Sequence, residues 1–245
     1  MSRFGRPAAR KPKPSVPECE AVLVSDLKGC AAGTMADLEK ELAEAGLACS
    51  VEAAHHTSIN WGSRHSNEDR VIAVTDSIGK IDVHTIGVLD GHDTDAASDF
   101  VSRHLPQVFS KHFKAGKPIE VAYTVAMAEV EDLLKNNKVA TAGTCVCSCT
   151  VVGPYVWCAN LGDCRAALVA LQVPESAESP TRPTAVNWMS RDHKASAPEE
   201  RRRIMSLGGQ VTNGRIEGLE PTRTLGDFDV KLSTKPGVIS IEPDV

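Results

Sequence analysis

The sequence predicts α-helices in four stretches, residues 34–46, 96–113, 119–134 and 198–209. In the first and third stretches the apolar residues recur with the spacing of an α-helix. Thr34 opens the first stretch, with Asp37 three residues later, which approximates a capping box. Pro198 stands at a favoured first helical position. Pro106 lies inside the second stretch, so we expect that helix to be interrupted or kinked there.

Between the helices, short runs of β-branched and other apolar residues predict strands. They cover residues 70–75, 85–89, 144–152, 155–160 and 166–170. Gly153 and Pro154 predict a hairpin turn, and the fifth run is expected to continue the meander. Strands joined by tight turns pair antiparallel, and the helices must then cover sheet faces. Residues 174–184 are rich in Pro, Ser and Thr and are predicted to form a surface loop.

Composition and charge exclude several classes of protein. The 245 residues are 42% hydrophobic and 24% charged, as in an ordinary globular protein. No apolar run approaches the roughly 18 residues of a membrane helix, so we expect no membrane span. The formal net charge is -5, although residues 1–17 are basic and rich in proline. An acidic body argues against a nucleic-acid partner and is compatible with cations.

The eight cysteines contain no Cys-x-x-Cys pair. Cys145, Cys147 and Cys149 alternate along a predicted strand and would share one sheet face. Buried thiols that behave as small hydrophobes explain them better than a zinc site, whose ligands are usually spaced more widely. With no apolar signal segment, the sequence predicts a reducing, intracellular location: the cytoplasm, with the nucleus left open.

Three acidic clusters each lie at the end of a predicted strand. Glu68 and Asp69 precede one strand, Asp90 and Gly91 follow the next, and Asp163 follows a third. Carboxylates at strand ends, beside glycines that allow tight turns, can converge on a hard cation such as Mg²⁺ or Mn²⁺. Each cluster taken alone is better explained as an ordinary turn with solvated acids.

The order of these clusters and their amino-acid sequences resemble the metal-dependent, type-2C (PPM-type) protein serine/threonine phosphatase family over residues 58–245. The matching motifs are Arg-x-x-x-Glu-Asp (64–69), Val-Leu-Asp-Gly-His (88–92), Ala-Gly-Thr (142–144), Ala-Asn-Leu-Gly-Asp-Cys-Arg (159–165), Arg-Asp-His-Lys (191–194), Pro-Glu-Glu-x-x-Arg-Ile (198–204), Thr-Arg-Thr-Leu-Gly-Asp-Phe-Asp (222–229) and Pro-Gly-Val-Ile (236–239). The resemblance implies an α+β fold, a four-layer α-β-β-α sandwich of two antiparallel sheets flanked by helices. It divides the chain into a basic arm (1–17), an extension with one helix (18–57) and the phosphatase-like domain (58–245).

The resemblance also implies a chemistry, the removal of phosphate from phosphoserine and phosphothreonine in protein substrates. Asp90 would bridge two Mn²⁺ or Mg²⁺ ions and the Gly91 carbonyl would bind one of them. Glu68 and Asp69 would hold metal-bound waters, and Asp163 would help to bind a third, weaker ion. Two cations lower the pKa of a shared water, so hydroxide is available near neutral pH.

Two further residues receive catalytic roles from the resemblance. Arg64 would bind phosphate oxygens bidentately, and His92 would protonate the departing alkoxide. Without the motif, Arg64 would be a surface salt-bridge residue and His92 a structural histidine. His193 has only a structural interpretation, and Trp61, Trp157 and Trp188 are expected to be packing residues.

The sequence departs from the family pattern in two ways. Asp93 stands where the family usually has glycine. Its carboxylate would be an additional hydrogen-bond acceptor outside the direct metal ligands, or its side chain would distort the loop. The Asp-Gly and Gly-Asp-Asn segments of the C-terminal part of the domain are not found in these residues, so we expect weak metal binding and little activity from this segment alone. Two functions follow: an active phosphatase, or an inactive phosphatase-like scaffold held in a larger assembly. A protein partner would then cover open sheet edges or bind the basic arm.

Overall fold

The computed structural model describes residues 34–45, 51–57, 66–79, 81–137, 141–172 and 182–245. The predicted basic arm and Trp61 lie outside these ranges. Within them the fold is α+β, and every pairing between its strands is antiparallel. None of the helices in this part of the chain is long and apolar enough to cross a membrane.

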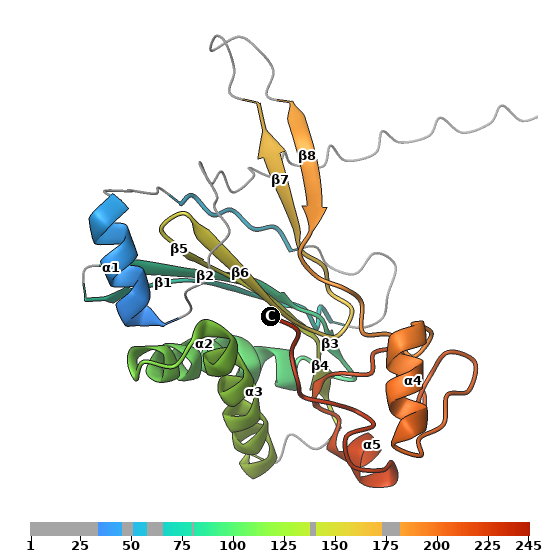
Figure 1. Ribbon diagram of the computed structural model, residues 1–245. Helices are drawn as coiled ribbons and strands as arrows, with labels where there is room; N and C mark the ends of the chain where they lie inside the picture. Colours follow the sequence, from blue (N-terminus) through green and yellow to red (C-terminus); the bar gives the residue numbers. More distant parts are fainter. Residues whose placement is uncertain (1–33, 46–50, 58–65, 80, 138–140, 173–181) are drawn as a thin grey trace, which may run out of the picture.

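A four-stranded sheet forms the centre of the fold (Figure 1). Its order is β1 (Arg70–Ile78), β2 (Ile81–Leu89), β5 (Val146–Val152) and β6 (Tyr155–Leu161). In its register Arg70 lies opposite Leu89 and Val146 lies opposite Leu161. The start of β1, the end of β2, the start of β5 and the end of β6 therefore meet at one edge of the sheet. The predicted strands and the β5–β6 hairpin are confirmed.

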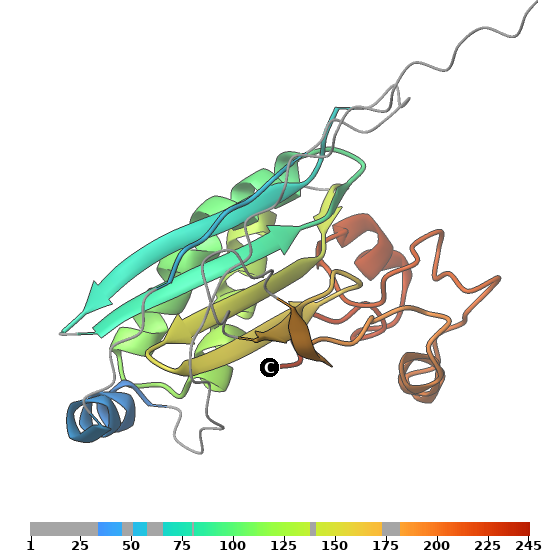
Figure 2. The same cartoon turned by 90° about the horizontal axis from the view of Figure 1, so that it is seen from above.

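Two helices cover one face of this sheet (Figure 2). They are α2 (Ala96–Lys114) and α3 (Ile119–Asn136), which pack against each other. Tyr123 of α3 is 1% exposed, and its hydroxyl lies 2.6 Å from Thr150 Oγ1 on β5. Helix α2 continues through Pro106, so the expected interruption is wrong, and the alternative of a kink stays a prediction. Leu105 and Phe109 beside Pro106 are buried in the core, and this packing outweighs the loss of one backbone hydrogen bond.

Helix α1 (Met35–Ala45) confirms the first predicted helix. Thr34 caps it, because the Asp37 N–H donates to Thr34 Oγ1 at 3.2 Å. Leu38 is fully buried in the same core as α2 and α3. A Cβ atom at Gly153, in the β5–β6 turn, would lie 2.3 Å from Leu42 Cδ2. Helix α1 therefore packs over the end of the sheet that lies opposite the acidic clusters.

The prediction of a continuing meander is wrong. Strands β7 (Ala167–Leu171) and β8 (Pro183–Trp188) form a separate two-stranded sheet, and β8 begins inside the segment predicted as loop. Gly162, with φ of +107°, turns the chain away from β6 before β7 begins. Trp188 is 66% exposed, which overturns its expected packing role, whereas Trp157 packs against the core. Trp188 lies at the end of a hairpin whose strand β8 is exposed throughout.

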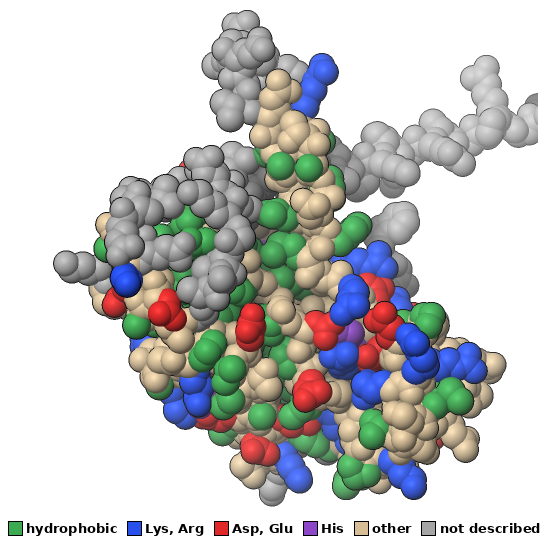
Figure 3. Space-filling model, viewed as in Figure 1, with side chains coloured by type: hydrophobic (Ala, Val, Ile, Leu, Met, Phe, Trp, Pro, Cys, Tyr) green, Lys and Arg blue, Asp and Glu red, His purple; other side chains and the backbone are tan. Residues whose placement is uncertain are grey.

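The remaining elements lie beside the edge of the sheet where the acidic clusters are found. Short strands β3 (Gly91–His92), β4 (Gly143–Thr144) and β9 (Leu225–Gly226) form a small sheet. Helix α4 (Pro198–Ser206), which begins where predicted, and α5 (Phe228–Ser233) follow. A second small core, which includes Ile204 and Val238, fixes α4. Acidic and basic side chains are interspersed over this part of the surface (Figure 3).

The described cysteines are free thiols. Cys145 and Cys147 are buried as predicted, and Cys149 is half-buried. Burial raises the pKa of the Cys145 thiol well above its ordinary value. These cysteines therefore behave as small core residues.

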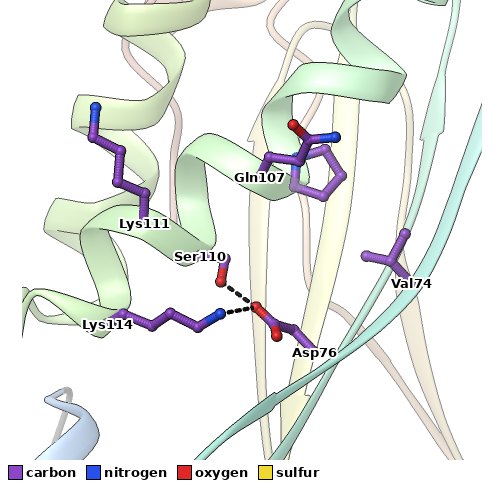
Figure 4. Close-up of a pocket in the computed structure, with 7 residues that line it drawn as sticks. Val74, Asp76, Gln107, Ser110, Lys111 and Lys114 are labelled. Carbon is purple, nitrogen blue, oxygen red and sulfur yellow. Dashed lines mark hydrogen bonds and ion pairs between the residues drawn. The ribbon is translucent and has the colours of Figure 1, made fainter.

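A polar contact ties α2 to the edge strand β1 (Figure 4). Lys114 Nζ lies 2.7 Å from Asp76 Oδ2, and the Ser110 hydroxyl donates to the same oxygen. The hydrogen bond from Lys114, and then that from Ser110, lowers the pKa of Asp76. A lowered pKa means that this contact stabilises the fold above the ordinary aspartate pKa and is lost as the pH falls through the lowered value. Because the pair is partly exposed, its contribution is at most about 1 kcal/mol.

The burial of Leu38 predicts the stability of the α1 contact. Leu38→Ala should lower the free energy of unfolding by about 2–5 kcal/mol, because it leaves a cavity between α1 and the core. Lys40→Ala, at an exposed position on the same helix, should change it by less than about 0.5 kcal/mol. Urea unfolding followed by circular dichroism measures both. Equal effects of the two variants would show that α1 does not pack as described.

Candidate functional site

The sheet register brings the three predicted acidic clusters together. Asp69 immediately precedes β1, Asp90 immediately follows β2, and Asp163 lies two residues beyond β6. A cavity of about 340 Å³ opens at this edge and is lined by Asp69, Asp90 and Cys164, among others. Acids that lie between 21 and 94 residues apart along the chain thus come together in one place.

The electrostatics of Asp90 show how closely the acids approach one another. The Asp90 side chain reaches solvent in the cavity, but the protein around it removes part of its hydration. This desolvation, and then the negative charges of Asp69, Asp163 and Glu68, raises the pKa of Asp90, against a smaller opposing effect of His92. The site therefore carries concentrated negative charge, which favours the binding of a cation.

The turn that carries Asp90 is held by its backbone. The Asp90 carbonyl accepts from the Cys145 N–H at 2.9 Å and from Thr144 Oγ1 at 3.1 Å. Gly91 follows, and a Cβ atom there would lie 2.3 Å from the Glu68 carbonyl oxygen. Only glycine allows the Glu68 and Asp90 segments to approach this closely.

The donor set fits Mn²⁺ or Mg²⁺ by its chemistry. Glu68, Asp69, Asp90 and Asp163 offer hard oxygen ligands, and Mg²⁺ is commonly bound through one or two carboxylates while it keeps several waters. Within the described ranges, however, no group of three His, Cys, Asp or Glu side chains stands close enough to form a ligand set by itself. Direct protein ligation here is therefore sparse, and water would have to complete the coordination.

Asp163 already has a cationic neighbour. Lys194 Nζ lies 3.3 Å from Asp163 Oδ2 and 3.1 Å from Glu220 Oε1. Cys145 Sγ lies 3.4 Å from the other Asp163 oxygen. A cation at Asp163 would therefore compete with an ammonium group for the same carboxylate.

His92 is held by a buried aspartate that the sequence analysis did not single out. His92 Nε2 lies 2.8 Å and 3.0 Å from the two carboxylate oxygens of Asp227, which is 2% exposed. Thr224 Oγ1 donates to Asp227 Oδ2 at 2.6 Å. Burial of the His92 ring opposes its protonation, but the hydrogen bond and charge of Asp227, with the charges of Asp90 and Glu68, outweigh burial and raise its pKa. The only sequence signal for Asp227 was its place in the motif at residues 222–229.

Asp93 keeps the conformation that a glycine would adopt. Its φ is +70°, in the left-handed region, and its carboxylate accepts from Thr141 Oγ1 at 2.7 Å. Aspartate tolerates this region better than most residues because its short side chain bonds locally. The loop after His92 therefore retains a left-handed residue at this position.

Arg64 lies outside the described residues. The two arginines that line the cavity, Arg70 and Arg165, are bound to aspartates. Arg165 makes two contacts of 2.7 Å with the carboxylate of Asp192. Neither arginine was a predicted phosphate ligand.

Comparison with known proteins identifies the class. A family model described as protein phosphatase 2C matches residues 54–245. Among solved structures, a serine-threonine phosphatase 2C from Toxoplasma gondii is similar with a TM-score of 0.52 and 22% identity, covering 75% of this chain and 69% of that one. A C. elegans sex determining protein gives a TM-score of 0.58 and 23% identity, covering 74% and 44%. At these identities the two structures show the α+β fold alone.

Curated sequences agree with the family model. Probable protein phosphatase 2C 57 of Oryza sativa subsp. japonica is 32% identical over 200 residues, which cover 75% of this chain and 51% of the relative. Protein phosphatase 2C homolog 3 of Schizosaccharomyces pombe is 30% identical over 196 residues, covering 75% and 44%. The chain belongs to the protein phosphatase 2C family, as its motifs predicted. It spans about half the length of these relatives.

The contact between His92 and Asp227 predicts the titration of His92 in the metal-free chain. Asp227→Asn should lower the pKa of His92, because it removes the carboxylate that stabilises the charged imidazolium. Asp82→Asn, at the far end of β2, should leave this pKa unchanged. Titration of the histidine ring signals by NMR measures both. An unchanged pKa in Asp227→Asn would contradict the described contact.

Proposed function

We propose that this chain acts in the metal-dependent dephosphorylation of phosphoserine and phosphothreonine in protein substrates. The observation that carries the proposal is the convergence of Glu68, Asp69 and Asp163 on Asp90, whose pKa is raised by desolvation and then by their charges. The chain belongs to a family whose relatives are named protein phosphatases, and this membership also supports the proposed dephosphorylation.

The acids at the sheet edge would hold the cations. Asp90 and the Gly91 carbonyl would hold the Mn²⁺ or Mg²⁺ ions directly, and Glu68 and Asp69 would hold them through water. Asp163 would hold a third ion more weakly, in keeping with the ammonium group of Lys194 beside it. When bound, the cations would lower the pKa of a water molecule so that a nucleophile exists near neutral pH.

The chain's own side chains would handle the phosphate and the proton. Arg64 would bind the phosphate oxygens in a bidentate manner. Although burial opposes protonation, the hydrogen bond and charge of Asp227 raise the pKa of His92 and so favour a protonated ring. Asp227 engages its Nε2 atom, so Nδ1 is the ring nitrogen that would deliver this proton to the leaving seryl or threonyl oxygen. Asp227 is thus a positioning residue for His92.

The second candidate function is an inactive, phosphatase-like scaffold within a larger assembly. It is favoured by the sparse direct ligation in the described residues and by the ion pair between Asp163 and Lys194. In this case a protein partner would cover the sheet edges or bind the basic arm. The two candidates differ in one measurable property, which is metal-dependent turnover of a phosphopeptide.

The test is hydrolysis of a phosphothreonine peptide by the purified chain, together with calorimetric titration of Mn²⁺. Hydrolysis should require added Mn²⁺ or Mg²⁺ and fall to background with EDTA, because the cations supply the nucleophile. Asp90→Asn should abolish hydrolysis and weaken Mn²⁺ binding, because it removes the carboxylate proposed to hold the ions. Asp132→Asn, on the exposed face of α3, should match the unaltered chain.

Two outcomes would reject the phosphatase proposal. Hydrolysis that persists in EDTA, or Asp90→Asn at the unaltered rate, would remove the mechanism. Tight Mn²⁺ binding with robust turnover by the chain alone would reject the scaffold.

A further inference from the structure

The loop that carries Asp163 is held from behind by a buried histidine. His193 is 3% exposed, and its Nδ1 atom accepts from the Gly162 N–H at 3.1 Å. The backbone N–H of His193 in turn donates to the Gly162 carbonyl at 2.9 Å. His193 therefore contacts the backbone of Gly162 on both its N–H and its carbonyl side, one residue before Asp163.

This backbone has little room to move. Gly162 has φ of +107°, and a Cβ atom there would lie 2.3 Å from Cys145 Sγ. The buried Asn160 side chain donates to the Gly162 carbonyl at 3.2 Å and to the Arg191 carbonyl at 2.7 Å. The direction in which the Asp163 side chain leaves the backbone is thus set by the contacts of its neighbour.

The contacts define the protonation of the His193 ring. Because Nδ1 accepts a hydrogen bond, it carries no proton, and the proton of the neutral ring is on Nε2. Among the described residues Nε2 makes no hydrogen bond of good geometry, but it lies 3.1 Å from Asp244 Oδ2, which favours a proton there. Burial, and then the charge of Arg223, lowers the pKa of His193, against the opposing effect of Asp244, and keeps the ring neutral.

Asp244 is itself fixed. Arg223 Nη1 lies 3.0 Å from Asp244 Oδ1, and Asp244 exchanges two backbone hydrogen bonds with Asn160, of 2.8 Å and 2.9 Å. Arg223 also binds the buried Glu200 at 2.7 Å. A continuous set of contacts therefore leads from α4 through Asp244 to the ring.

We propose that His193 is a positioning residue that orients Asp163 toward a bound divalent cation, through its hydrogen bond with the Gly162 peptide. This inference rests on the proposed function, which assigns Asp163 to a cation. Partners behind metal ligands commonly change metal affinity by about 10-fold to 100-fold when they are replaced. The sequence offered only a structural role for His193, because its two partners become neighbours in the folded chain alone.

Two substitutions distinguish the contribution of Nδ1 from that of Nε2. In His193→Asn the side-chain oxygen can occupy the place of Nδ1 and accept from Gly162, whereas the longer His193→Gln places its amide near Nε2 and leaves the Gly162 N–H without an acceptor. We expect His193→Gln to weaken the Asp163-dependent Mn²⁺ affinity about 10-fold and His193→Asn to keep nearly all of it. The probe is Mn²⁺ alone, titrated into the full chain by calorimetry, with Asp163→Asn as the reference.

A second measurement does not depend on the variants or on activity. The nitrogen chemical shifts of the His193 ring in the unaltered chain should show an unprotonated Nδ1 and a protonated Nε2. Thermal unfolding checks that each variant is folded at the temperature of titration. If a variant does not fold, the ring shifts decide: a protonated Nδ1 overturns the proposal, and an unprotonated Nδ1 supports it.

The results distinguish this inference from the function on which it rests. If His193→Gln binds Mn²⁺ like the unaltered chain while Asp163→Asn binds it weakly, the positioning role is wrong and the role of Asp163 stands. Equal weakening by His193→Asn and His193→Gln would also overturn the positioning role, because only ring volume would then matter. If Asp163→Asn changes nothing, the assignment of Asp163 to a cation fails, and the inference fails with it.

Discussion

The concentration of carboxylates at one edge of the central sheet is the constraint on which the candidate site depends. Desolvation, and then repulsion from the neighbouring carboxylates, raises the pKa of Asp90 in the folded chain. The packing around Gly91 and the two hydrogen bonds to the Asp90 carbonyl hold the acids together despite this repulsion. A positive charge would offset this repulsion, and Lys194 supplies one beside Asp163.

Two histidines near this edge show how the surroundings of an imidazole ring change its pKa and therefore its role. His92 and His193 each lie about 3 Å from a carboxylate, Asp227 and Asp244 respectively. For His92 the carboxylates outweigh burial and raise the pKa, which suits a proton donor. For His193 burial and Arg223 prevail and lower the pKa, which suits a neutral ring that accepts a hydrogen bond from the backbone.

Two aspartates near His92 have a left-handed backbone conformation. Asp93 and Asp227 have φ of +70° and +51°, and each receives a hydrogen bond from a threonine, Thr141 and Thr224. Non-glycine residues in this region carry strain of about 1–2 kcal/mol, which the surrounding contacts must offset. A buried Asp227 in this conformation points its carboxylate at His92, so the strain accompanies a specific contact.

The sequence by itself determined the local elements and the strand-end acids. The helical spacing of apolar residues predicted α1 and α3, and the acids beside β1, β2 and β6 were recognised from strand ends and motif order. Periodicity reports only which face of an element is apolar, so it could not show that α2 runs through Pro106 or that β7 leaves the central sheet. The tertiary structure alone decided that Asp227 meets His92 across 135 residues and that His193 contacts Gly162, because such contacts depend on how distant segments pack.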